Sequence, residues 1–130
     1  MTVTVVRRWF EKLPDYEKDI PLLILDGKAY TPRATLAEVE RGTELGKRLQ
    51  DLVEKKTFGT LASDEETLAK LRSKAIIGTM PDKPLFATLL IPPRTFTPQE
   101  LANEVQRETV LGRQWIDAEK KQMAYLMTLR

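Results

Sequence analysis

The feature that most constrains this chain is an internal repeat. Residues 30–51 align without gaps with residues 96–117, and nine of the 22 aligned positions are identical. Unrelated sequences of average composition would share roughly one or two. A repeat of this length dictates architecture, because two copies of one sequence adopt the same local structure. The identical pairs are Thr31/Thr97, Pro32/Pro98, Glu38/Glu104, Val39/Val105, Arg41/Arg107, Thr43/Thr109, Leu45/Leu111, Gly46/Gly112 and Asp51/Asp117.

The similarity continues more weakly upstream of this alignment. Leu13-Pro14-Asp15 resembles Met80-Pro81-Asp82, and Pro21-Leu22 resembles Pro84-Leu85, with small differences in length between them. A chain of 130 residues is long enough for one domain with one modest core. We therefore predict a single domain over residues 1–130 with two internal repeats, at about residues 14–57 and 80–129.

Each repeat contains a recognisable helix start. Thr97 can cap free backbone N–H groups, and Pro98 at the first helical position sacrifices no hydrogen bond. Glu100 completes a capping box in the second repeat, whereas the first repeat has Ala34 at that position. The Thr-Pro pair therefore predicts that a helix begins at the same place in both repeats.

The main elements predicted from these starts are two long helices, over residues 32–55 and 98–129. Gly42 could break the first helix, but its counterpart Glu108 would not break the second, so both are expected to be continuous. A shorter third helix is predicted from Ser63, with Glu66 three residues later, to about Lys74.

Short apolar segments supply the rest of the fold. Leu22–Leu25 and Leu85–Ile91 could each be a buried strand or a short core helix, because periodicity does not separate the two. Asp26-Gly27 is a tight-turn signal that favours a hairpin. Thr2–Val6 alternates like an edge strand or an extended arm. The predicted fold class is mainly α, with two long helices, a shorter third helix, and a small β hairpin or two short strands.

Small residues recur on one face of the two long helices. Glycine inside a helix costs up to about 1 kcal/mol relative to alanine, and both repeats accept that cost at the same position. The pattern favours close approach of another backbone, although glycines that are merely inherited and tolerated would look the same. The predicted helix-packing residues are Thr43, Gly46, Thr109 and Gly112.

The composition excludes much enzyme chemistry. The chain has no cysteine and no histidine, so it lacks thiolates and the commonest general base and metal ligand. It has no glycine-rich phosphate loop, and Asp64-Glu65-Glu66 fits the acidic first turn of a helix. We predict no catalytic residue, metal site, cofactor or small-molecule ligand. An enzyme would have to rely on carboxylates and lysines alone.

Basic residues cluster locally in a chain whose net charge is only +2. Basic strips without reading loops suit contact with phosphates rather than base readout, although a solvated helix face has the same pattern. The predicted nucleic-acid-binding residues are Arg7, Arg8, Lys47, Arg48, Arg113, Lys120 and Lys121.

Composition and hydropathy also suggest a location. The longest mostly apolar run, Leu85–Ile91, is too short to span a bilayer, and Glu11 and Pro14 interrupt any signal-peptide core. We expect a cytoplasmic or virion protein that is not secreted. A single asparagine and abundant Lys, Arg and Glu resemble thermophile composition.

Three loose motifs resemble RecB-like nucleases of the CRISPR adaptation type. Gly42–Lys47 looks like their first motif helix, Ile76-Ile77-Gly78 followed by Asp82 is similar to their strand with a metal-binding aspartate, and Gln122–Tyr125 looks like their closing helix. Their motif histidine has no counterpart, and Pro92-Pro93-Arg94 stands where an acidic residue and a lysine are needed. The resemblance therefore implies an inactive site that cannot assemble two-metal hydrolysis.

Inactivated proteins of that kind resemble the nucleocapsid proteins of filamentous viruses of hyperthermophilic archaea. This resemblance implies a non-enzymatic structural protein that forms homo- or hetero-oligomers and coats DNA without sequence readout. The alternative is a protein-interaction or adaptor domain with no nucleic-acid role.

Overall fold

The computed structural model describes residues 2–80, 85–87 and 94–130, and these residues are mainly helical. The predicted mainly α class with a short β hairpin is confirmed. In chain order the elements are α1 (Thr2–Lys12), the 3-10 helix η1 (Asp15–Asp19), β1 (Leu23–Leu25), β2 (Lys28–Tyr30), α2 (Pro32–Arg41), α3 (Glu44–Lys55), α4 (Asp64–Gly78), β3 (Leu85–Ala87), β4 (Arg94–Phe96), α5 (Pro98–Arg107) and α6 (Val110–Leu126).

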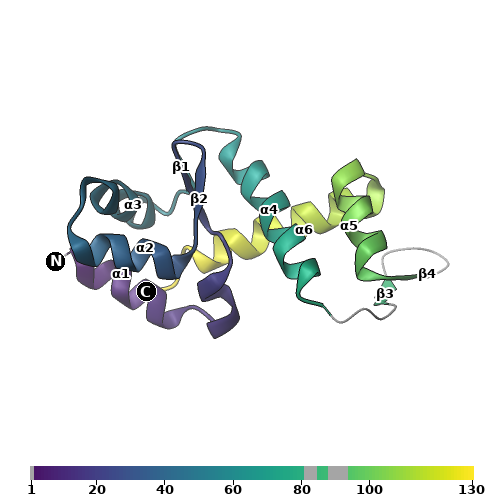
Figure 1. Ribbon diagram of the computed structural model, residues 1–130, viewed down its shortest axis with the longest axis horizontal. Coiled ribbons are helices and arrows are strands. Elements are labelled where there is room, and N and C mark those ends of the chain that lie inside the picture. The colour runs from purple at the N-terminus through teal and green to yellow at the C-terminus, as the bar shows by residue number, and fades with distance from the viewer. Residues whose placement is uncertain (1, 81–84, 88–93) are drawn as a thin grey trace.

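The order of elements occurs twice along the chain. A leading helix, a hairpin and a helix pair appear as α1, β1–β2 and α2–α3, and again as α4, β3–β4 and α5–α6 (Figure 1). Each leading helix packs against both helices of the pair in its own repeat. The structural repeat is therefore larger than the one read from sequence, because it includes leading helices that begin well before residues 14 and 80.

Both hairpins are antiparallel, and each is followed by a helix in the chain. In the first, Leu23 lies opposite Tyr30, and Asp26 and Gly27 form the turn with φ of 53° and 78°. Two successive residues with positive φ match the twist of a two-residue hairpin turn, so the Asp-Gly prediction is confirmed. In the second, Leu85 lies opposite Phe96. The apolar segment predicted to reach Ile91 is a strand as far as Ala87, and residues 88–91 lie outside the described residues.

The prediction of two long continuous helices was wrong. Each splits into a pair, because the chain turns at Gly42 with φ of 69° and at Glu108 with φ of 52°. Glu108 ends α5 in the same left-handed conformation as Gly42, contrary to the prediction that it would not break the helix. The residue after each turn, Thr43 or Thr109, caps the second helix of the pair. Capping satisfies backbone donors that a continuous helix would have used, which offsets the cost of the turn.

The N-terminal segment also differs from its prediction. Thr2–Val6 is neither a strand nor an arm, because it forms the first part of helix α1. Val6, Trp9 and Leu13 are buried at spacings of three and four residues, as one face of a helix requires. The predicted third helix is present as α4, and it continues past Lys74 to Gly78.

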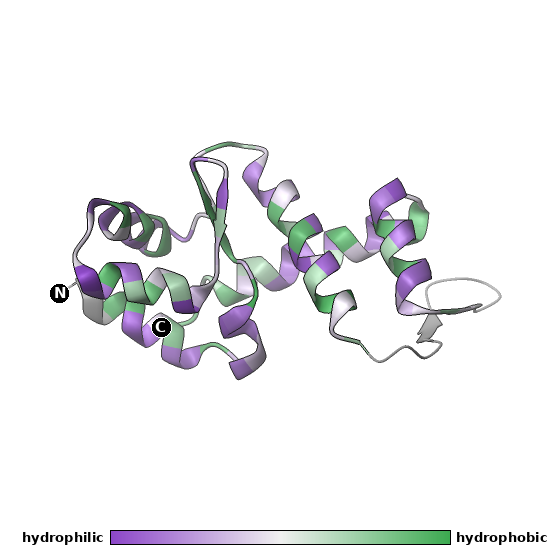
Figure 2. Cartoon of the chain, viewed as in Figure 1, coloured by the Kyte–Doolittle hydropathy of each residue, from purple (hydrophilic) through white to green (hydrophobic). Residues whose placement is uncertain are grey.

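The molecule is elongated, and helix α6 runs from the second repeat back to the first (Figure 1). Its last turn is fastened there, because Trp9 Nε1 donates a hydrogen bond to the carbonyl of Leu126 at 3.0 Å. Beyond the helix, Arg130 donates to the carbonyl of Val53 at 2.8 Å. Hydrophilic and hydrophobic residues alternate along most of the helices (Figure 2), so each helix contributes one apolar side to a shared core.

Candidate protein-binding groove

The residues shared by the two repeats build the turn inside each helix pair. In the first pair the hydroxyl of Thr43 accepts a hydrogen bond from the N–H of Gly46 at 2.9 Å and lies 3.0 Å from a carboxylate oxygen of Glu38. In the second, the hydroxyl of Thr109 makes the same two contacts with the N–H of Gly112 and the carboxylate of Glu104, at 3.2 and 3.0 Å. One local geometry therefore accounts for three of the repeated identities.

The two glycines lie where the helices of a pair come closest. A Cβ atom at Gly46 would collide with the backbone carbonyl of Glu38, and one at Gly112 would collide with that of Glu104. The close backbone is the preceding helix of the same repeat. These two glycines therefore maintain the fold. A binding site that belongs to one repeat alone would use positions at which the two repeats differ.

Several of the cations predicted to bind nucleic acid make ion pairs within the chain. Arg7 pairs with Glu40 at 2.7 Å, and Arg48 makes two hydrogen bonds to Asp26, at 2.7 and 3.2 Å. The hydrogen bond from Arg48 lowers the pKa of the Asp26 carboxyl. Arg8, Lys47 and Lys121 are exposed and make no ion pair with any described residue.

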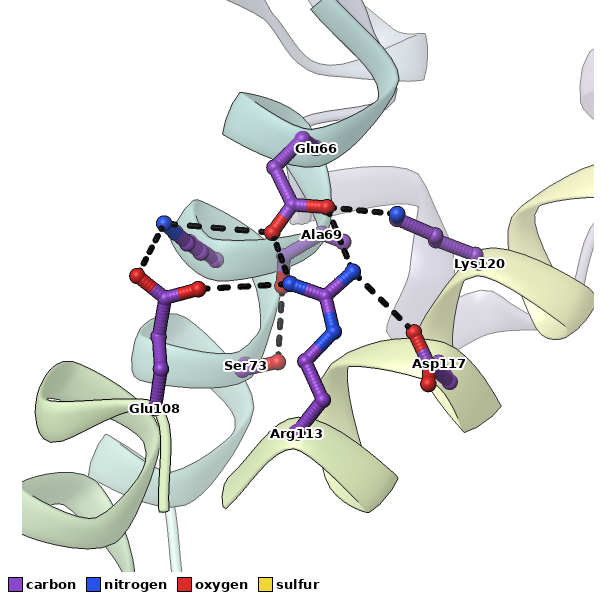
Figure 3. A network of polar contacts seen from close by, with 8 residues as sticks. Glu66, Ala69, Ser73, Glu108, Arg113, Asp117 and Lys120 are labelled. Atoms are coloured by element: carbon purple, nitrogen blue, oxygen red, sulfur yellow. Dashed lines mark hydrogen bonds and ion pairs between the residues drawn. The ribbon is translucent and has the colours of Figure 1, made fainter. Parts of the chain in front are cut away.

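Arg113 and Lys120 belong to an ion-pair network between α4 and α6 (Figure 3). Both terminal nitrogens of Arg113 donate to the carboxylate of Glu66, at 2.6 and 2.8 Å, and Lys120 approaches the same carboxylate at 2.5 Å. The hydrogen bond from Arg113, followed by that from Lys120, lowers the pKa of Glu66 to about 2. Two of the three predicted cations on α6 are thus already paired with a carboxylate of α4.

The structure also contains a buried ion cluster that the sequence did not predict. Arg72 on α4 is fully buried, donating to Glu17 at 2.7 and 3.0 Å and to Glu119 at 2.6 Å. It also donates to the carbonyl of Pro21 at 3.1 Å. The partners are 47 to 55 residues away in the chain, so no local pattern signals the cluster. It joins η1 of the first repeat to α4 and α6 of the second.

A groove of about 390 Å³ lies between α4 and α5. Its floor contains Ile77 and Val105, which are buried, and Ala102, which is partly buried. Leu71 stands at the rim with 41% of its surface exposed, so its apolar side chain is accessible to a ligand. The remaining described lining residues are polar: Thr67, Lys70, Lys74 and Gln106.

The corresponding face of the first repeat has a larger side chain in place of Ala102 and a bridging ion pair. Ala102 aligns with Leu36, and Gln106 aligns with Glu40. When the Pro-Asp pairs that follow the leading helices are aligned, Lys74 corresponds to Arg7. In the first repeat Leu36 packs against the core, and Arg7 bridges α1 to Glu40 of α2. The groove is therefore located at positions where the two repeats have diverged.

A second hollow, of about 310 Å³, borders the predicted cations Lys47 and Arg48. Glu44 and Asp51 line the same hollow, so its charges of opposite sign nearly cancel. It lacks the uniformly positive lining that a phosphate-binding surface would present.

No protein family, curated protein or solved structure matches this chain.

The resemblance to inactivated RecB-like nucleases stays a prediction. Asp82, Pro92 and Pro93 lie outside the described residues. Within the described ranges, no group of three or more acidic residues is arranged so that it could hold a metal ion. Among those same residues, no helix combines the length and the apolar character that crossing a membrane would require.

Proposed function

We propose that this chain is a non-catalytic interaction scaffold, and that its second repeat binds a helix of a partner protein in the groove between α4 and α5. The observation that carries the proposal is the apolar floor of this groove beside the exposed Leu71, where the first repeat instead has Leu36 and the Arg7–Glu40 ion pair. An apolar centre surrounded by a polar rim is the usual arrangement of a protein-binding surface.

The shape of the groove favours a helical ligand. Thr67, Leu71 and Lys74 line it from α4 at spacings of three and four residues, and the strip continues to Ile77. At a rise of 1.5 Å per residue the ten steps from Thr67 to Ile77 span about 15 Å, close to three turns of a helix. A third helix can pack into the space between two others by setting its ridges of side chains in their groove.

Coating of nucleic acid, the function implied by the resemblance, is the competing proposal. Its support is the exposed cations Arg8, Lys47 and Lys121, whose positive charge no described carboxylate balances directly. Four of the seven predicted contact residues are occupied by ion pairs within the chain: Arg7, Arg48, Arg113 and Lys120. Releasing them would cost the interactions that they now make, so we favour binding of a protein partner.

The proposal can be tested with displayed helical peptides and a variant that fills the groove. A library of peptides about 14 residues long, roughly four helical turns, carries varied apolar residues on one face and equal proportions of Glu, Lys and Gln elsewhere. It is selected on the wild-type protein and on Ala102→Leu, which introduces the side chain found in the first repeat. We expect enriched peptides to bind Ala102→Leu at least roughly tenfold more weakly, because leucine occupies the space for their anchor.

Two controls accompany this selection. Lys47→Ala lies outside the groove, so it should leave binding unchanged, and the helical circular dichroism of all variants should match. Failure to recover any peptide that distinguishes the wild type from Ala102→Leu would contradict the proposal. Salt-sensitive binding of a DNA duplex that is lost when Arg8, Lys47 and Lys121 are replaced by alanine would favour coating of nucleic acid instead.

A further inference from the structure

We infer that the helix bound in this groove is acidic, with a carboxylate that pairs with Lys74 beside an apolar anchor. The inference rests on the proposed function and adds to it the chemical class of the partner.

The first repeat has an ion pair at this position between its leading helix and the next helix. There Arg7 of the leading helix pairs with Glu40 of the next helix at 2.7 Å. In the second repeat the basic residue is retained as Lys74, but the position of Glu40 is taken by the neutral Gln106. Lys74 is exposed and makes no ion pair with any described residue. The ammonium group of Lys74 is therefore available to a carboxylate of the ligand.

The other lining residues of the groove also favour an acidic ligand. Its described lining contains two lysines and no carboxylate. Lys70 already pairs with Glu108 at 3.1 Å and lies 3.8 Å from Glu66, so Lys74 is the lysine available to a partner. The side-chain amide of Gln106 can donate a hydrogen bond to the same incoming carboxylate. A basic ligand would face Lys74 without any compensating charge from the described lining, which disfavours it.

The spacing of the lining side chains on α4 predicts the spacing of the contact residues on a ligand helix. Leu71 and Lys74 are three residues apart, so the apolar rim and the free ammonium group lie about one helical turn apart. A ligand helix lying along the groove would place a large apolar residue over Ala102 and an acidic residue three or four positions away. The apolar anchor would supply most of the affinity, and the ion pair would supply selectivity and a faster association rate.

The test uses one peptide from the selected pool that binds the wild type but not Ala102→Leu. It is synthesised with its acidic residue as Glu and as the isosteric Gln, and both forms are titrated against the wild type and Lys74→Gln. We expect the wild type to prefer the Glu form by roughly two- to fivefold, the range for a solvent-accessible ion pair. Lys74→Gln should abolish this preference without changing the affinity for the Gln form.

Reversing the charge at position 74 and on the peptide provides the decisive measurement. Lys74→Glu should weaken binding of the Glu peptide and strengthen binding of the same peptide with Lys at that position. Lys121→Gln removes an exposed lysine of α6 that lies outside the groove, so it should leave both affinities unchanged.

Different negative results would contradict the acidic partner and the proposed function on which it rests. Groove-dependent peptides whose Kd is the same with Glu or Gln, and the same for Lys74→Gln, would overturn the acidic partner while leaving the scaffold function intact. Absence of any groove-dependent peptide would contradict the function itself. Self-association that Ala102→Leu abolishes, measured by light scattering during gel filtration, would overturn the inference by making a second copy the occupant.

Discussion

Glycine stands at the third position of both α3 and α6 because the preceding helix passes there. In each case a threonine caps the helix and a glutamate from the preceding helix lies within hydrogen-bond distance of that threonine. The repeated sequence pattern is thus a description of one turn between two closely packed helices. Close approach was predicted from the small residues, but the approaching backbone belongs to the same helix pair.

Substitution of these glycines tests the close contact. Gly46→Ala and Gly112→Ala should each lower the free energy of unfolding by about 1–3 kcal/mol, because the added methyl group collides with a backbone carbonyl. The higher helix propensity of alanine, worth up to about 1 kcal/mol, offsets only part of this loss. Gly78→Ala is the matched control, since a methyl group there would meet no neighbouring atom within 4 Å. Urea denaturation that ranks all three variants alike would show that packing is not the reason for glycine.

At the scale of elements, the predicted cations of α6 mainly stabilise its contact with α4 rather than forming an unpaired basic surface. Glu66 on α4 accepts from Arg113 and Lys120, which are two turns apart on α6, and Arg113 also pairs with Asp117 at 3.2 Å. The network holds the leading helix of the second repeat against the last helix. Its members are partly exposed, with 30% of the Glu66 side chain and 38% of the Arg113 side chain accessible, so solvent screens the interaction.

The lowered pKa of Glu66 predicts a pH-dependent contribution to stability. Its folded value of about 2 lies below the ordinary value of 4.5, so the folded state favours the ionised form. The contribution is fully present above about pH 5 and is lost as the pH falls toward about 2. Glu66→Gln should therefore lower the free energy of unfolding by about 1 kcal/mol at neutral pH, after screening is allowed for.

Urea denaturation across this pH range checks the sign of the effect. The difference between wild type and Glu66→Gln should shrink steadily from about pH 5 to about pH 2, and it should also be smaller in high salt. A difference that stays constant with pH would mean that the ionised Glu66 carboxylate does not contribute to stability.

At the scale of the whole molecule, the two repeats share one helix and one buried ion cluster. The end of α6 is fastened to the first repeat through Trp9, and Arg72 joins Glu17 of the first repeat to Glu119 of α6. Removing one partner of such a buried cluster leaves an uncompensated charge, which is costly. The repeats are therefore coupled, and neither should unfold alone.

Two tryptophans, one in each repeat, make this coupling measurable. Trp9 lies in α1, Trp115 lies in α6, and the chain has no others. In Trp9→Phe and in Trp115→Phe, the fluorescence of the remaining tryptophan should follow the same urea transition as the helical circular dichroism. Separate midpoints for fluorescence and circular dichroism within either variant would show that the repeats unfold independently.

The sequence by itself determined the parts of the fold whose hydrogen bonds and backbone conformations depend on residues close together in the chain. The duplication, the Thr-Pro helix starts and the Asp-Gly hairpin depend on local backbone chemistry, and each was predicted from neighbouring residues. The mainly helical class followed from the same signals.

Only the tertiary structure decided the features that depend on partners far apart in the chain. Glu108 adopts a left-handed turn within a helix pair whose close packing admits only glycine at position 112, so its own helix propensity did not predict it. Arg113 and Lys120 are used within the fold because Glu66, about 50 residues away, is folded against them. The groove exists because α4 and α5 place Lys74 near Ala102, and no pattern along the chain contains that proximity. Charge and hydropathy along a sequence show what a side chain can do, whereas the packing of helices decides which of those interactions is already occupied.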